Sequence, residues 1–305
     1  MIEREGLIPL RPAQEEAFWS DAGLEFLLWR RQFGKSRTLG AWALRQMIEM
    51  RGCSLFFVSA SIVLGTENIR KESEIWNETT RLLRIGVEKL GFRLTTNADE
   101  LVKSGDMDGI ADMFEHSKLE TKLWHDRTTY SRSRVCAPNP ATAVGWTGHV
   151  VLDEVGRIPD LKDVLEAVEP FMSSNPKFRW RMASTPPPDD DHYSWEIIVP
   201  PQDEWPVNER GNRYESQAGI AVHRVDCYDA YAGGVPMYHP KTRKPISPEE
   251  SRALAFDKTA WDRNYALRFI RGGAAAMSLS HLFLAMERGQ NEGRAVAISE
   301  EVVAG

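Results

Sequence analysis

Residues Leu24–Arg37, LEFLLWRRQFGKSR, contain the pattern that decides the fold. The apolar run Phe26–Trp29 is long enough for a buried strand, and the polar residues that follow it indicate a turn. Lys35 and Ser36 then begin a series of residues with helical spacing. A strand, a turn and the sequence Gly-Lys-Ser at the start of a helix together predict a phosphate-binding loop of the P-loop type.

The residues of this loop suit the binding of a nucleoside triphosphate. Main-chain N–H groups of the turn and of the first helical turn face a bound phosphate, and the helix dipole adds positive potential there. Gly34 allows close approach of the backbone, Lys35 reaches the β- and γ-phosphate oxygens, and the Ser36 hydroxyl ligates Mg²⁺. The predicted binding residues of the loop are Arg30, Gln32, Phe33, Gly34, Lys35, Ser36 and Arg37.

The loop departs from the usual pattern at its first position. The pattern G-x-x-x-x-G-K-[ST] places a glycine at position 29, where this chain has Trp29. The tripeptide Gly-Lys-Ser alone is equally compatible with an ordinary helix N-terminus. The interpretation therefore depends on a second half of the site elsewhere in the chain.

Two adjacent acidic residues supply that second half. The aliphatic run His149–Leu152 ends in Asp153 and Glu154. We expect Asp153 to hold Mg²⁺, directly or through water, and Glu154 to act as the general base on the attacking water. Neighbouring strand residues point to opposite faces, so a turn must begin here if both carboxylates face one site. Taken alone, a strand that ends in solvated acids is the alternative interpretation.

Two further segments extend the predicted site. Gln14 lies just upstream of the first strand, and its amide has the donor and the acceptor that an adenine edge needs. A solvated helix glutamine is the alternative for this residue. Later in the chain, Ser184 and Thr185 form a small hydroxyl-bearing tip after a predicted strand. Such a tip can sense the γ-phosphate, so we expect these two residues to couple hydrolysis to motion.

Length and composition limit the classes of protein that fit. The 305 residues suffice for one large domain or for a domain with a smaller companion. No apolar run approaches the roughly 20 residues of a membrane span, and the charged N-terminus is unlike a signal peptide. Three separated cysteines indicate neither zinc nor disulfides, so we expect a cytoplasmic protein. The net charge of −6 predicts that any contact with nucleic acid is local and salt-sensitive.

The chain alternates predicted strands with predicted helices, which is typical of an α/β fold with a mainly parallel sheet flanked by helices. Strand-like runs occupy residues 54–60, 92–96, 119–123, 131–137, 177–182 and 220–225. Helical patterns follow Ser36 and occupy residues 66–90, 159–171, 248–256 and 259–270. We expect a P-loop core over residues 1–215, a small lid or linker subdomain over 216–288, and a poorly anchored tail over 289–305.

With these residues in place, the chain resembles the ATPase domain of the large terminase subunits of tailed bacteriophages, over most of residues 7–285. Five segments carry the resemblance. The loop Arg30–Ser36 is similar to the family variant R-Q-x-G-K-[ST], which lacks the leading glycine, and Pro12–Gln14 is similar to the segment with the adenine-contacting glutamine. Residues 140–154 resemble the segment with the second acidic motif, Ala183–Pro186 resembles the coupling motif, and Trp261–Phe269 resembles the connector before the nuclease half.

The resemblance implies a P-loop NTPase of the ASCE/RecA-like class that hydrolyses ATP with Mg²⁺ and moves double-stranded DNA into a procapsid. It implies that Arg31 and Lys35 stabilise charge on the γ-phosphate and that Ser36 and Asp153 place the metal. The implied partners are DNA, the portal protein and procapsid, the small terminase subunit, a nuclease domain or separate nuclease, and further copies of the chain in a ring. The implied location is the cytoplasm of an infected bacterial host, transiently at the portal, without a membrane.

Two departures from the family pattern change these expectations. Many relatives have an arginine that acts on a neighbouring subunit where this chain has Val144, so Arg157 and Arg134 are candidates for that role, and Arg31 is a candidate in cis. Only about 20 residues follow position 285, too few for an RNase H-like domain, so we expect no nuclease activity. The alternatives are a helicase-type ATPase and a capsid-interaction protein with a degenerate nucleotide site.

Overall fold

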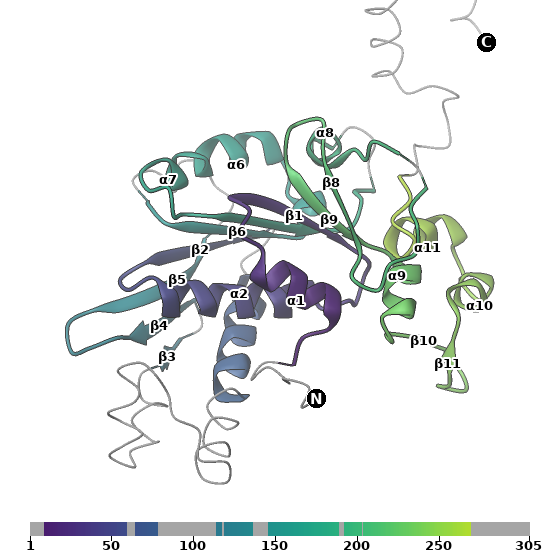
Figure 1. The fold of residues 1–305 in the computed structure, drawn as a ribbon, viewed down its shortest axis with the longest axis horizontal. Coiled ribbons are helices and arrows are strands. Elements are labelled where there is room, and N and C mark those ends of the chain that lie inside the picture. Colours follow the sequence, from purple (N-terminus) through teal and green to yellow (C-terminus); the bar gives the residue numbers. More distant parts are fainter. Residues whose placement is uncertain are drawn as a thin grey trace, which may run out of the picture.

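A nine-stranded sheet organises the protein (Figure 1). The computed structural model describes residues 9–59, 65–78, 114–117, 119–136, 146–188, 192–202 and 204–269. The strands lie in the order β3-β4-β5-β2-β6-β7-β1-β9-β8. Their bounds are β1 Leu24–Trp29, β2 Ser54–Ser59, β3 Phe114–His116, β4 Glu120–Trp124, β5 Tyr130–Cys136, β6 His149–Asp153, β7 Trp180–Ser184, β8 Asn212–Glu215 and β9 Ala221–Val225. The six central strands are parallel and the edge strands β3, β4 and β8 pair antiparallel, which confirms the predicted α/β class with a mainly parallel sheet.

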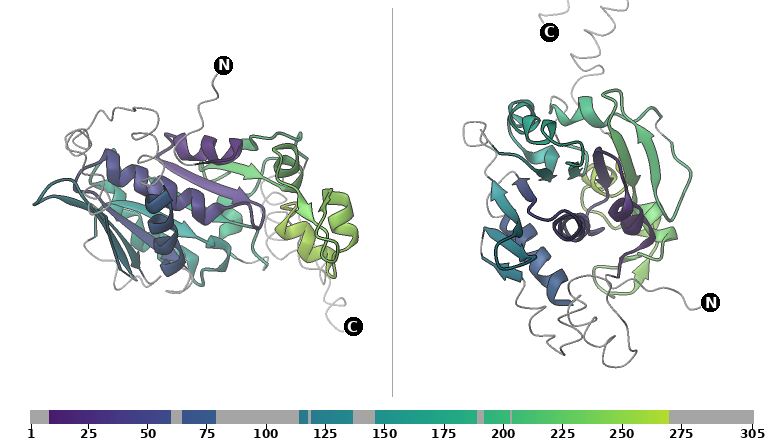
Figure 2. Two further views of the ribbon diagram at one scale, coloured as in Figure 1. Left: turned by 90° about the horizontal axis from the view of Figure 1, so that it is seen from below. Right: turned by 60° about the vertical axis from the view of Figure 1, so that its left-hand side comes forward.

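Helices cover both faces of the sheet, so its central strands are buried on both sides (Figures 1 and 2). In β1, Phe26 and Leu28 join one apolar core, whereas Leu27 and Trp29 join the other. This alternation explains why the strand reads as an uninterrupted apolar run. One face carries α1 (Pro12–Trp19), α2 (Lys35–Glu49) and a helix over residues 65–78, and the other carries α6 (Leu161–Val168), α7 (Pro170–Ser173) and α8 (Ser194–Ile198).

The strand order places β7 between β1 and β6. Leu28 of β1 pairs with Ser184 of β7, and Asp153 of β6 pairs with Ala183. The three parallel strands therefore end level with one another at a single edge of the sheet. Because ligands of open α/β sheets bind at the carboxyl ends of the strands, this edge is where a site is expected.

A smaller unit adjoins this edge and is coloured yellow-green in Figures 1 and 2. It contains α9 (Cys227–Ala232), β10 (Met237–Tyr238), β11 (Pro245–Ile246), α10 (Pro248–Ala253) and α11 (Lys258–Asn264). Both β8 and β9 pair within the large sheet, so the sheet continues to Val225, past the expected boundary at residue 216. Ser247 accepts a hydrogen bond from the Glu250 N–H and caps the start of α10.

Several element limits differ from the prediction. The helix expected over 159–171 is two helices, and the second begins at Pro170, whose ring nitrogen has no hydrogen to donate. The last helix ends at Asn264 instead of residue 270, and Leu267 then adopts a positive φ of 54° and is buried in the core. The run predicted as a strand over 177–182 is β7, which begins three residues later. The strand expected over 92–96, the end of the 66–90 helix and the 289–305 tail lie outside the described residues.

Candidate nucleotide-binding site

The loop between β1 and α2 has the backbone of a phosphate-binding turn. Gln32 and Gly34 have positive φ angles of 61° and 96°, and Gly34 is the N-cap of α2. Trp29 is the last, fully buried residue of β1, and its ring packs edge-on against Phe33 at 5.3 Å. The residue at the position of the usual first glycine therefore belongs to the strand and its core.

Gly34→Ala is expected to lower the free energy of unfolding by about 2 kcal/mol, because a left-handed backbone costs an L residue about 1–2 kcal/mol and the new methyl meets a neighbour. A Cβ at position 34 would lie 2.5 Å from Nε2 of Gln14. Urea unfolding measures the loss. Gly234→Ala is the matched control, because Gly234 also has a positive φ, of 76°, but open space at its Cβ. Equal losses in the two variants would show that the contact with Gln14 contributes nothing.

Lys35 lies at the centre of the site. Its side chain is 6% exposed, and Nζ lies 3.3 Å from the carbonyl oxygen of Trp29 and 3.8 Å from Oε1 of Glu154. Burial lowers the pKa of Lys35, while the carboxylates of Glu154 and Asp153 oppose that shift. The ammonium group is thus held, largely desolvated, beside the acid pair from the other half of the predicted site.

The acid pair has the geometry that a shared site requires. Asp153 ends β6 and is 4% exposed, and its Oδ2 accepts a hydrogen bond of 2.8 Å from the Ser36 hydroxyl. Glu154 has φ 53° and ψ 47°, a left-handed conformation that is uncommon for a residue other than glycine. The turn required by the sequence argument is therefore present and lets both carboxylates face Lys35 and Ser36.

These oxygen groups fit a magnesium ion. Burial, and then the charge of Glu154, raises the pKa of Asp153, so a cation bound beside this carboxylate would favour its ionised form. Mg²⁺ is usually held by one or two protein oxygen ligands, with substrate phosphates and waters completing its octahedron. The Ser36 hydroxyl and the Asp153 carboxylate match that donor set.

The two coupling candidates lie between the halves of the site. Ser184 ends β7 and is buried, and its Oγ accepts a hydrogen bond of 2.9 Å from the Gly156 N–H. Gly156 belongs to the 3-10 helix η2 (Val155–Arg157), which follows Glu154 directly. Thr185 is buried beside it, and its carbonyl lies 3.1 Å from the position of a Cβ at Gly156. The segment that follows Glu154 is therefore in direct contact with the end of β7.

Other predicted binding residues lie near the loop, but their side chains are engaged elsewhere. Gln14 donates from Nε2 to the Phe33 carbonyl at 3.0 Å and accepts from the Arg11 N–H at 3.0 Å. The buried guanidinium of Arg30 donates to the Val235 carbonyl at 3.2 Å, and that of Arg37 pairs with Glu78 at 2.7 Å. In this structure Gln14 supports the loop itself, and the side chains of Arg30 and Arg37 point to protein partners.

Three arginines are candidates for the charge-stabilising role. Arg31 is exposed in the loop before Lys35, and its charge helps to lower the pKa of Lys35. Arg157 is 56% exposed, with Nε 4.0 Å from Oε2 of Glu154. Arg134 instead pairs with Glu120 at 3.7 Å on the edge strands. The structure therefore brings Arg31 and Arg157 to the site and leaves Arg134 outside it, whereas Val144 lies outside the described residues.

Sequence reasoning missed one residue beside the acid pair. Asn68, in the helix over residues 65–78, is 1% exposed, and its side chain helps to lower the pKa of Asp153. No local motif marks this asparagine, because its proximity to Asp153 arises from the packing of its helix. A polar residue in the first turn of the helix after β2 is the only signal that the sequence contains.

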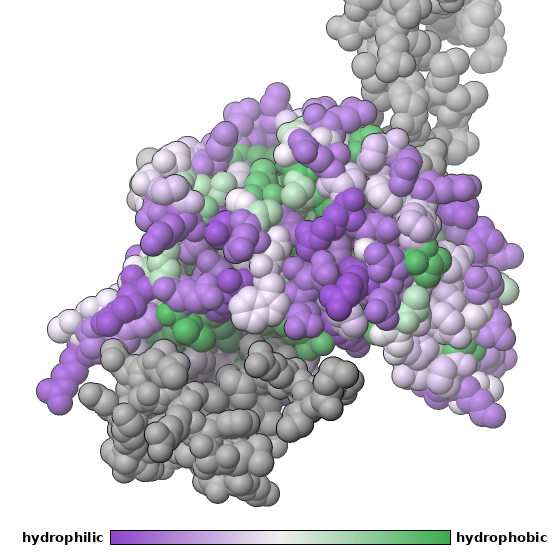
Figure 3. All heavy atoms as spheres, viewed as in Figure 1, coloured by the Kyte–Doolittle hydropathy of each residue, from purple (hydrophilic) through white to green (hydrophobic). Residues whose placement is uncertain are grey.

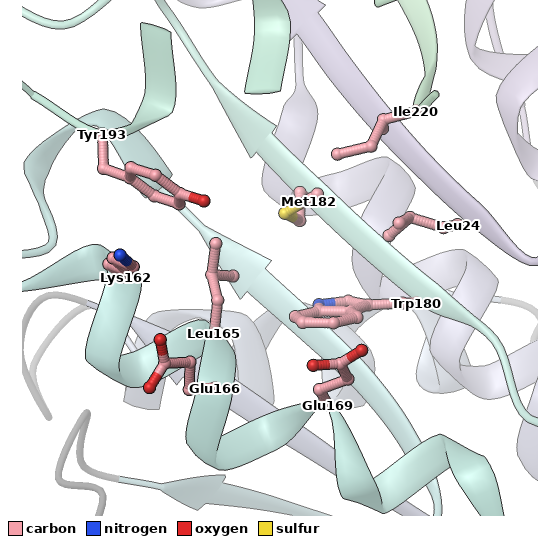
Figure 4. A pocket seen from close by; sticks show the side chains of 9 residues that line it. All are labelled: Leu24, Lys162, Leu165, Glu166, Glu169, Trp180, Met182, Tyr193 and Ile220. Carbon is pink, nitrogen blue, oxygen red and sulfur yellow. The ribbon is translucent and has the colours of Figure 1, made fainter. Parts of the chain in front are cut away.

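A hollow of about 210 Å³ lies away from this site, at the amino-terminal halves of β1 and β7. Leu24, Leu165, Trp180 and Met182 line it, with Lys162 among the charged residues at its side (Figure 4). Apolar residues gather in the same region in the space-filling view of Figure 3. The residues of the loop between β1 and α2, and the acid pair Asp153 and Glu154, are not part of this lining, so the hollow is separate from the candidate nucleotide site. In the described part of the chain, no helix has the length and apolarity to cross a bilayer.

Solved structures of phage large terminases share this fold. The ATPase domain of the Thermus phage P74-26 large terminase matches with a TM-score of 0.55 and 17% identity, over 88% of this chain and 98% of that domain. The large terminase of a thermophilic bacteriophage matches with a TM-score of 0.50 and 11% identity, over 84% of this chain and 53% of that protein, about half of its length. No protein-family model matches the sequence, and no curated protein matches it. The resemblance to terminase ATPase domains is confirmed at the level of the fold.

Proposed function

We propose that this chain, which has the fold of the large-terminase ATPase domains, binds and hydrolyses ATP with Mg²⁺. The convergence of the two predicted half-sites carries the proposal. Lys35 and Glu154 lie 3.8 Å apart, and Ser36 bonds to Asp153 over a separation of 117 residues in the sequence. Phosphoryl transfer to water requires a cation, a hydroxyl and carboxylates around the phosphates. Here these groups meet at the end of a parallel strand, next to a helix N-terminus.

Each group has a distinct role in this proposal. Ser36 and Asp153 would hold Mg²⁺, which would supply positive charge to the phosphates. Lys35 exchanges its contact with Glu154 for the phosphates, which frees the Glu154 carboxylate to accept a proton from the attacking water. Arg31 neutralises charge on the γ-phosphate in cis, and the main-chain N–H groups of the loop bind the phosphates.

We propose further that hydrolysis drives a DNA-packaging motor. The structural relatives are phage large terminases, and the contacts of the loop give a route to motion. The Arg31 N–H donates to the Asn264 carbonyl at 2.8 Å, and Arg30 bonds to Val235, so the loop is tied directly to the smaller unit. In this proposal the smaller unit acts as a lid, Ser184 and Thr185 couple hydrolysis to it, and exposed Arg157 acts on a neighbouring copy in a ring.

The proposed setting of the motor follows the family resemblance. The chain would act in the cytoplasm of an infected bacterial host, at the portal of a procapsid, with double-stranded DNA as its cargo. The small terminase subunit and a nuclease domain or separate nuclease would complete the machine. A ring that supplies an arginine from a neighbour predicts that the isolated chain hydrolyses ATP slowly.

The test measures phosphate release from ATP by the purified full chain. We expect hydrolysis that requires Mg²⁺ and stops when the metal is chelated, and a rate at least about tenfold higher when portal and procapsid are present, as expected for a trans-acting arginine. Stimulation by single-stranded nucleic acid, without an effect of procapsids, would favour the helicase alternative. Absence of nucleotide binding and of hydrolysis under all these conditions would overturn the proposal and favour a capsid-interaction protein.

A further inference from the structure

The helix over residues 65–78 presents two buried polar residues one helical turn apart, Asn68 and Glu72. Glu72 is fully buried, which raises its pKa to about 7, and its carboxylate accepts hydrogen bonds from Thr121, at 2.6 Å, and from Ser133. Among the described residues, neither amide atom of Asn68 has a hydrogen-bond partner of normal geometry. Oε2 of Glu72 is thus bonded to strands β4 and β5, whereas Oε1 of Glu72 and both amide atoms of Asn68 are buried without a partner among the described residues.

Asn68 lies where the metal-binding groups converge. Its helix packs closely on α2, because a Cβ at Gly40 would lie 3.5 Å from the main-chain nitrogen of Glu72. Ser36 lies one turn before Gly40 in α2, and Asn68 lies one turn before Glu72 in the other helix. The packing of the two helices at Gly40 and Glu72 thus brings Asn68 toward the end of α2 that holds Ser36, and the Asn68 side chain accordingly helps to lower the pKa of Asp153, to which Ser36 is bonded.

A buried amide without partners is costly in free energy and needs an explanation. A hydrogen bond to Asp153 alone would use one N–H of Asn68 and leave its carbonyl oxygen unpaired. A water molecule satisfies both ends of the amide, since it donates to the carbonyl and accepts from the N–H. Mg²⁺ characteristically keeps several of its waters when it binds to proteins.

We propose that Asn68 is a positioning residue of the nucleotide site, whose carboxamide holds a water ligand of the Mg²⁺ ion bound by Ser36 and Asp153. The inference rests on the proposed function. It adds to the nucleotide site a residue that lies outside both the phosphate-binding loop and the acid pair. Polar groups that orient the ligands of a metal contribute roughly 10–100-fold to metal affinity. The contribution of Asn68 therefore concerns the metal and not the binding of the nucleotide in its absence.

The test compares metal binding in the full chain and in Asn68→Leu, which has a similar volume without polar atoms. Binding of a fluorescent ATP analogue is titrated with Mg²⁺, and Mn²⁺ binding is followed by electron paramagnetic resonance. We expect the half-saturating metal concentration to rise about 10–100-fold in Asn68→Leu, with metal-free analogue binding unchanged. Asn68→Asp keeps an acceptor and adds a negative charge, so it is expected to bind the metal more tightly than the wild type.

Glu72→Gln is the matched control, because it changes a buried polar residue of the same helix away from Asp153, and we expect its metal dependence to equal that of the wild type. A folded Asn68→Leu variant with metal binding within twofold of the wild type would overturn the inference and leave the proposed function standing. If Asn68→Leu does not fold, unchanged or weaker metal binding by Asn68→Asp overturns it. Absence of metal-dependent analogue binding in the wild-type chain would instead overturn the proposed function.

Discussion

Lys35→Ala is expected to lower kcat/KM for ATP hydrolysis about 1000-fold, the scale of losing a preorganised charge from a phosphoryl-transfer site. The ammonium is 6% exposed and lies within 4 Å of both the Trp29 carbonyl and the Glu154 carboxylate, so its position is set before the nucleotide arrives. No other lysine side chain among the described residues approaches Glu154 this closely. Phosphate release and the affinity for a fluorescent ATP analogue measure the effect.

Nucleotide affinity should fall together with the rate in Lys35→Ala, because the lysine contacts the phosphates in the ground state as well as in the transition state. Lys177→Ala is the control, since Lys177 is exposed and precedes β7 at the opposite edge of the sheet. A rate in Lys35→Ala within threefold of the wild type would contradict the assignment of the loop to phosphate binding.

Glu154→Gln is expected to slow hydrolysis by about 100- to 10,000-fold, the range for loss of a general base, while nucleotide binding is retained. The amide keeps the size and the hydrogen-bonding oxygen of the carboxylate but cannot take a proton from water. The charge of Glu154 raises the pKa of the adjacent Asp153, so its removal leaves Asp153 more readily ionised and available to the metal. Single-turnover hydrolysis and equilibrium binding of ATP separate the two effects.

The pair of variants distinguishes two functions of neighbouring side chains. Lys35→Ala loses both binding and hydrolysis, whereas Glu154→Gln should hold ATP without turning it over. Glu166→Gln is a control for Glu154→Gln, because Glu166 lies on α6 beside the hollow of Figure 4 and away from the nucleotide site. Rapid hydrolysis by Glu154→Gln would show that another group activates the water.

The sequence determined the elements whose signals are local. Apolar runs marked β1, β2 and β6, and the chemistry of Lys35, Ser36, Asp153 and Glu154 predicted the two halves of the candidate site. The turn at Glu154 was also predictable, because two adjacent acids of a strand can face one site only if the strand ends there. Pro170 contained the signal for the break between α6 and α7, which the helical periodicity concealed.

Tertiary structure alone decided the features that depend on distant partners. The position of β7 between β1 and β6 arises from pairing between strands far apart in the chain, and the Arg30 side chain turns away from the loop because the Val235 carbonyl, 205 residues later, accepts its hydrogen bond. Asn68 reaches Asp153 only through the packing of its helix on α2. Local residue patterns report which side chains a segment offers, but the energy that selects their neighbours comes from burial and hydrogen bonding between segments, which no short stretch of sequence contains.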